Sequence, residues 1–300
     1  MFPIIPANSA QGVSATQKAI FGYGNAGSNV SISNLVSSSG VVATDTTGVG
    51  TARTYIAASG YGGDKAIFGY GNPSTSITNL VSNSGVVATD TTGVGTSRDR
   101  LAATTYGLDK AIFGYGYIGG PATNISNKVS NSGVVAADTT GVGTVRYGPA
   151  AAGYGSTGQA LFGYGEIAGR WSMTNKVSNT GVVASDTSGV GTARSHLGAA
   201  SYGGDKAIFG YGDSGPTSSI SNKVSNLGVV AADTTGVGTP RFGLGAAGYG
   251  GDKAIFGYGN NAGHVSITNL VNNSGVVASD TTGVGTARTG LAAAGYSYST

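Results

Sequence analysis

Short apolar runs separated by glycine-rich turns recur along the chain, and this pattern predicts strands rather than helices. Within residues 55–98, YIAASGY is followed by GGD, a tripeptide that tolerates the positive φ of a tight hairpin turn. The next run, KAIFGYG, has adjacent apolar residues, which is typical of a strand covered on both faces. SITNLV and VVAT, joined by the turn SNSG, complete four predicted strands.

This unit occurs six times, because the tetrapeptide FGYG returns at steps of 45 to 49 residues. Its six copies start at Phe21, Phe68, Phe113, Phe162, Phe209 and Phe256. A period of this length is typical of propellers, solenoids and arrays. Four antiparallel strands per unit predict an all-β fold, a six-bladed β-propeller with one blade per unit.

The two ends of the chain carry complementary parts of one unit. The last unit stops after LAAAGY at residues 291–296, and the first begins at KAIF, residues 18–21. We therefore expect the N- and C-terminal strands to pair and close the ring, which removes open sheet edges. The predicted domains are an N-terminal arm, residues 1–17, and a propeller, residues 18–300. An open β-solenoid, which needs altered capping units, is the alternative.

Composition narrows the possible functions. Hydrophobic residues make up 39% of the chain, enough for a packed core despite 55 glycines. The absence of cysteine excludes disulfides and thiolate chemistry, and a net charge of +3 gives no footprint for nucleic acid. No apolar run is long enough to insert into a membrane, and the opening MFPIIP lacks the basic start of a secretion signal.

The repeat resembles the kelch repeat, in which a loop carrying an Arg leads into the innermost strand of each blade. Here FGYG stands where kelch units have a Gly doublet, and the usual tryptophan of the fourth strand is missing. The arginines of that loop are Arg53, Arg98, Arg146, Arg194, Arg241 and Arg288. The resemblance implies that LAAAGY is the innermost strand and GVVATD the outermost.

Six variable loops between the second and third strands fall on one face of the predicted ring, where divergent loops on a rigid scaffold commonly build binding surfaces. They span residues 25–30, 72–75, 117–123, 166–171, 213–218 and 260–265. The fourth is the richest, with Glu166, Arg170 and the only tryptophan, Trp171. Tyr117 and His264 are weaker candidates. Simple drift of surface loops is the alternative interpretation.

An aspartate precedes each repeated arginine by eight residues. These aspartates are Asp45, Asp90, Asp138, Asp186, Asp233 and Asp280. A charged ring that gathers an ion is one interpretation of the two sets. A structural role is the interpretation we favour, because Asp before Thr-Thr-Gly or Thr-Ser-Gly can accept backbone N–H bonds while the arginine crosses to a neighbouring blade.

Catalytic residues are scarce. The chain has two histidines and a single glutamate, too few for a metal site or a carboxylate pair, so we expect no enzyme, no metal and no cofactor.

The phrase TNLVSNTGVVATDTTGVGTAR, as the repeat reads across its copies, resembles repeats of structural or tail-associated proteins of tailed bacteriophages. This resemblance implies a non-enzymatic virion component, such as a tail, fibre or decoration protein, that presents its loops to other virion proteins or a host surface. Phe2, Ile4 and Ile5 of the arm are candidate anchoring residues. A glycan-binding propeller lectin is the alternative.

Overall fold

The computed structural model describes residues 17–297, and this part of the chain is all-β, as predicted. Its strands form six three-stranded antiparallel sheets. The described residues contain no helix, and so none that could cross a membrane. The arm residues Phe2, Ile4 and Ile5 lie outside the described range.

Each sheet has an inner, a middle and an outer strand, and the middle one pairs with both of the others. The inner strands are β3 (Ala57–Tyr61), β6 (Ala102–Tyr106), β9 (Ala150–Tyr154), β12 (Gly198–Tyr202), β15 (Gly245–Tyr249) and β18 (Ala292–Tyr296). The middle strands are β1 (Lys18–Gly22), β4 (Lys65–Gly69), β7 (Lys110–Tyr117), β10 (Gln159–Gly163), β13 (Lys206–Asp213) and β16 (Lys253–Asn260). The outer strands are β2 (Ser33–Val36), β5 (Thr78–Val81), β8 (Ala122–Val129), β11 (Thr174–Val177), β14 (Thr217–Val224) and β17 (His264–Val271).

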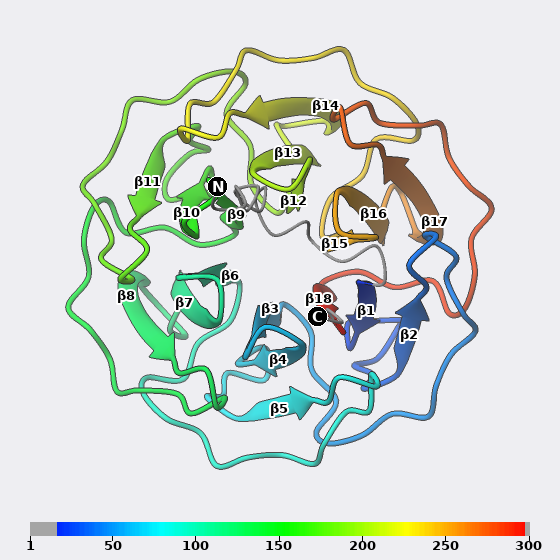
Figure 1. Ribbon diagram of the computed structural model, residues 1–300, viewed down its shortest axis with the longest axis horizontal. Helices are drawn as coiled ribbons and strands as arrows, with labels where there is room; N and C mark the ends of the chain where they lie inside the picture. Colours follow the sequence, from blue (N-terminus) through cyan, green and yellow to red (C-terminus); the bar gives the residue numbers. More distant parts are fainter. Residues whose placement is uncertain (1–16, 298–300) are drawn as a thin grey trace, which may run out of the picture.

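The six sheets lie around a common centre, with the inner strands nearest to it (Figure 1). Each inner strand contacts the inner strands of the two neighbouring sheets, in the cyclic order β3, β6, β9, β12, β15, β18 and back to β3. The sheet order β18-β1-β2 joins the two ends of the chain: β1 pairs with β18 in a register that sets Lys18 opposite Tyr296.

The predicted fourth strand is wrong. The segment after each outer strand makes only isolated bridges, such as Val36 with Val42 and Ser33 with Thr46, instead of a continuous ladder. In the first unit the side chain of Asn34 donates to the carbonyl of Ala43, at 3.0 Å, where a backbone ladder would otherwise continue. Val41 in this segment is 65% exposed. The segment therefore follows the rim of the sheet without completing a strand.

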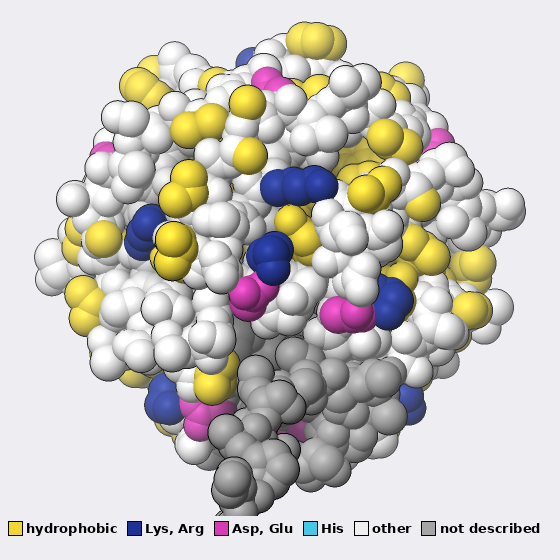
Figure 2. Space-filling view, turned by 45° about the horizontal axis from the view of Figure 1, so that its top comes forward, with side chains coloured by type: hydrophobic (Ala, Val, Ile, Leu, Met, Phe, Trp, Pro, Cys, Tyr) yellow, Lys and Arg dark blue, Asp and Glu magenta, His cyan; other side chains and the backbone are white. Residues whose placement is uncertain are grey.

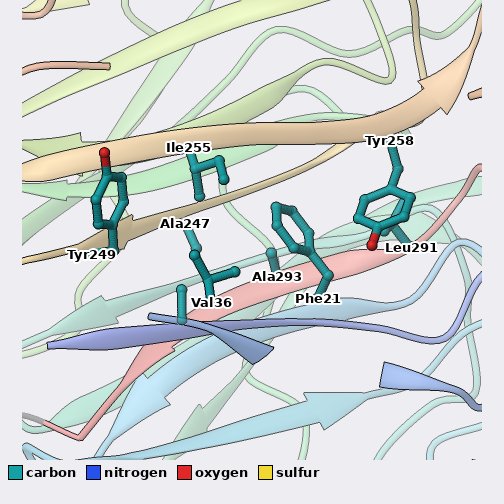
Figure 3. Close-up of a cluster of buried hydrophobic side chains, with 9 residues drawn as sticks. Phe21, Val36, Ala247, Tyr249, Ile255, Tyr258, Leu291 and Ala293 are labelled. Atoms are coloured by element: carbon teal, nitrogen blue, oxygen red, sulfur yellow. The ribbon is translucent and has the colours of Figure 1, made fainter. Parts of the chain in front are cut away.

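Apolar clusters fill the spaces between neighbouring sheets. In Figure 3, Phe21 and Val36 from one sheet pack with Tyr249, Ile255 and Tyr258 from the next. The first glycine of FGYG makes this approach possible, since a Cβ on Gly257 would lie 2.7 Å from the Phe21 ring. The same contact recurs between the other neighbouring sheets, which explains why each phenylalanine is followed by glycine.

Candidate functional site

The six repeated arginines are fully buried and join neighbouring sheets. Arg146 stacks on the ring of Tyr115 from the preceding sheet, with its guanidinium carbon 4.1 Å from the ring centroid. Toward the following sheet it donates to the carbonyl of Tyr164 at 2.7 Å and to the side-chain oxygen of Asn175 at 2.7 Å. These contacts make the arginine a bridge within the core, closed off from any ligand.

The six aspartates tie the same sheets together from outside. Asp186 accepts hydrogen bonds from the backbone and hydroxyl of Thr144 and from the side chain of Asn175. Partial burial by itself would raise the pKa of Asp186, but these hydrogen bonds and the charge of Arg146 hold it below its ordinary value. Asp186 lies 3.9 Å from Arg146, the arginine of the preceding connection, rather than beside Arg194, eight residues later.

A collar of backbone hydrogen bonds surrounds the central axis, formed by the second residue after each repeated arginine. Each N–H donates to the carbonyl of the equivalent residue in the neighbouring unit, at 2.6 to 3.0 Å, and the six bonds form a closed cycle. The collar residues are Tyr55, Arg100, Gly148, His196, Gly243 and Gly290. All six have positive φ, including the three that are not glycine.

The three large collar residues converge over the axis. Tyr55 and His196 precede β3 and β12, which lie on opposite sides of the ring, yet their rings meet edge to face with centroids 5.7 Å apart. The guanidinium of Arg100 lies over the Tyr55 ring at 4.7 Å and near the Tyr147 ring at 5.8 Å. Tyr147 is also in edge contact with Tyr117, so an aromatic arc surrounds the arginine.

Beneath these side chains lies a cavity of about 80 Å³, the axial pocket, at the same end of the axis. Its lining consists of the collar and of the apolar residue that follows each collar position. Those apolar residues are Ile56, Leu101, Pro149, Leu197, Leu244 and Leu291. The pocket is thus lined by a ring of apolar residues and by the polar and aromatic side chains of the collar, which we call the axial mouth.

Two ion pairs partly neutralise the charged side chains near the mouth. Asp99 lies 3.2 Å from Arg100, and its side chain is only 3% exposed. Arg170 pairs with Asp213 at 2.6 Å. Arg100 keeps 29% of its side chain exposed, and a guanidinium has five N–H donors, so the pair with Asp99 leaves donors for a ligand.

His196 is held neutral. Burial and the nearby positive charge of Arg100 lower the pKa of its imidazole to about 4. Glu166 lies 3.7 Å from its Nδ1 atom, and the hydroxyl of Ser195 lies 3.2 Å from the same nitrogen. At neutral pH the imidazole therefore contributes a polar edge without charge.

The binding residues predicted from the variable loops fall into two groups, one near the axis and one away from it. Tyr117 lies near the guanidinium of Arg100, Glu166 lies near His196, and Arg170 pairs with Asp213. Trp171 is 42% exposed, and its indole N–H is directed at the carbonyl of Ile167 in its own hairpin. His264 begins β17 and pairs with Asn260 directly beside the turn of the β16–β17 hairpin.

The collar side chains were not predicted, although the sequence contained a signal for them. The three residues after the repeated arginines read TYI, DRL, YGP, SHL, FGL and TGL. These are positions where the repeat diverges outside its variable loops, and the structure places all six triplets around the axis.

Acidic and basic side chains also lie in pairs on the outer surface of the protein. Figure 2 shows a face on which basic and acidic side chains lie beside one another, with hydrophobic side chains scattered among them. Pairs such as Lys65 with Asp64, at 2.5 Å, are half exposed and contribute little to stability.

Comparison with known proteins supports the fold alone. No protein-family model matches the chain, and no curated protein matches it. Among solved structures, a fungal alcohol oxidase of the AA5 family in complex with copper is similar, with a TM-score of 0.55 and 15% sequence identity. The match covers 92% of this chain and 65% of the oxidase, so the chain spans just under two thirds of that protein.

This finding overturns the function predicted from the sequence, a non-enzymatic virion component or, alternatively, a lectin. The similar structure is that of an alcohol oxidase and not of a virion protein. The prediction was wrong because it rested on the residues that recur in every repeat. Those residues hold neighbouring sheets together and do not form a binding or catalytic site.

The residues at the axis do not fit the copper of that oxidase. Within residues 17–297 no group of three or more His, Cys, Asp or Glu side chains could share a metal ion. Among residues 17–297, His196 is the imidazole at the mouth, and burial together with the positive charge of Arg100 lowers its pKa. The same charge would repel a metal cation.

Proposed function

We propose that the chain is a closed, kelch-like propeller of six blades whose axial pocket binds a small oxyanion. The closed arrangement is supported by the pairing of β1 with β18 and by the collar, whose six hydrogen bonds return to their starting residue. The kelch-like character is supported by the buried arginine that leads into each inner strand.

Arg100 is the observation that carries the proposed function. It is the cationic member of the collar, its side chain is partly exposed, and three tyrosine rings hold its guanidinium in place. A planar guanidinium matches the two oxygens of a carboxylate or phosphate. Holding it in advance reduces the entropy lost when a ligand binds.

The size of the pocket limits the ligand. A cavity of about 80 Å³ is a few times the roughly 30 Å³ that one water occupies in the liquid. It is well below the roughly 300 Å³ at which drug-sized ligands begin to fit. A small carboxylate or inorganic phosphate therefore suits it better than a sugar or a nucleotide.

The geometry supports binding more than acid–base catalysis. A Ser-His-acid relay needs its two partners on different nitrogens of the imidazole. Here Ser195 and Glu166 both approach Nδ1 of His196, and Ser195 is fully buried.

Replacing Arg100 by glycine tests the proposal. Glycine already occupies three collar positions and suits the positive φ of Arg100, so we expect the variant to keep the collar backbone, although Asp99 loses its ion pair. Loss of a charged hydrogen bond worth about 1.5–3 kcal/mol should weaken the binding of acetate or phosphate by roughly 10- to 150-fold. Isothermal titration calorimetry at low ionic strength measures this.

Arg170→Gln is the matched control, because Arg170 is similarly exposed, at 31%, and pairs with Asp213 in the same network. It should change the dissociation constant less than twofold. Equal affinities of the wild type and the Arg100→Gly variant would refute the proposal, as would the absence of measurable binding by the wild type.

A further inference from the structure

A second cavity, of about 240 Å³, lies at the rim of the ring, beside β15, β16 and β17. We call it the rim pocket. Its lining is mostly apolar and includes Tyr249, Leu270, Val271, Val276 and Ala278. Val276 is 56% exposed, so the pocket opens to solvent. Its volume is sufficient for one or two apolar side chains, and it is separate from the axial pocket.

The repeat itself explains why space remains here. At this position of the outer strand three units have lysine, and three have leucine, namely Leu35, Leu80 and Leu270. Each of those lysines reaches the next unit's turn: Lys128 donates to the carbonyl of Thr180, Lys176 to that of Leu227 and Lys223 to that of Ser274. Leu270 is too short for this bridge and packs instead on the cluster drawn in Figure 3. Leucine in place of lysine at position 270 therefore leaves an open apolar surface where three other units have a charged side chain that bridges to the next unit.

The chain enters the described structure directly beside this pocket. The backbone carbonyl of Gln17 accepts from the N–H of Gly250 at 2.9 Å, and its side-chain oxygen accepts from the N–H of Gly251 at 3.1 Å. These glycines form the turn between Tyr249 and Lys253, both of which line the pocket. Gln17, the first described residue, thus lies next to the opening.

We propose that the N-terminal segment of the same chain occupies the rim pocket through Phe2, Ile4 and Ile5. Residues 1–16 contain no charged side chain, which suits an apolar lining. Prolines follow Phe2 and Ile5, and a residue before proline is restricted to extended conformations, so less entropy is lost on docking. The twelve steps from Ile5 to Gln17 span up to about 40 Å when extended, so reach is not limiting.

Leu270→Lys tests this docking, because it introduces the residue that three other units carry and should preserve the fold. Leu80→Lys makes the same exchange in β5, two sheets further along the ring, and is the matched control. The reporter is 4-fluorophenylalanine placed at position 2, observed by ¹⁹F NMR on the full chain. A thermal melt of each variant establishes that it is folded.

In the wild type we expect a ¹⁹F shift distinct from that of a free peptide of residues 1–16, and insensitive to exchange of H₂O for D₂O. Leu270→Lys should return the signal to the free-peptide shift, whereas Leu80→Lys should leave it unchanged. A free-peptide shift in the wild type, or an unchanged shift in Leu270→Lys, would overturn the proposal. A shift that depends on protein concentration would also overturn it, in favour of a second copy as the occupant.

Discussion

Replacing Arg146 by alanine is expected to lower the free energy of unfolding by about 3–5 kcal/mol, the usual loss when one partner of a buried charged network is removed. Its side chain is fully buried and donates to the carbonyls of Tyr164 and Thr144 and to the side chain of Asn175. The substitution leaves these acceptors unpaired, removes the stacking on Tyr115 and opens a cavity between two sheets. Urea unfolding followed by circular dichroism measures the change.

Arg170→Ala provides the comparison for this experiment. Arg170 also forms an ion pair, 2.6 Å from Asp213, but its side chain is 31% exposed. Solvent screens such a pair, and its loss should cost no more than about 1 kcal/mol. Equal losses for the two alanine variants would contradict the structural role assigned to the buried arginines.

Truncation after Gly290 is expected to abolish the cooperative fold. It removes β18, the strand that completes the sheet of β1 and β2, together with the buried side chains of Leu291 and Tyr296. Burial of a large apolar side chain contributes about 1.5–3 kcal/mol, and the loss also unpairs one edge of β1. The sum is comparable with the 5–15 kcal/mol that stabilises a typical protein.

Size-exclusion chromatography and a thermal melt test this prediction. A chain ending at residue 297 is the control and should melt like the full chain, because it keeps all of β18. A synthetic peptide of residues 291–300, added to the truncated protein, should restore part of the transition. A truncated protein that melts cooperatively near the wild-type temperature would refute a stabilising role for β18.

The repetitive part of the fold was predictable because the same residues make the same packing contacts in every unit. KAIFGYG predicted a doubly covered strand, and Phe21 against Gly257 shows why the motif has that form. The rim segment was predicted incorrectly. Its valines have high β propensity, but strand formation depends on a continuous partner, and the side chain of Asn34 takes the place of part of the ladder.

The axial mouth was harder to predict, because its residues are distant in sequence and each occurs once. Tyr55 and His196 meet only because the ring brings opposite sheets together, a contact that no local pattern encodes. The variable loops suggested Tyr117, Glu166 and Arg170, which lie near the axis, but the same reasoning suggested Trp171 and His264, which lie in their own hairpins. The divergent triplets after each repeated arginine were the better guide.

The most direct test of the account measures whether the first and last units are neighbours. The chain has no cysteine, and Val41, Val86, Val182 and Val276 are equivalent, exposed rim positions for spin labels in cysteine variants. Double electron–electron resonance should give similar distances for the pairs 41–276 and 41–86, both shorter than that for 41–182. A 41–276 distance longer than the other two would indicate an open array and contradict the closed ring.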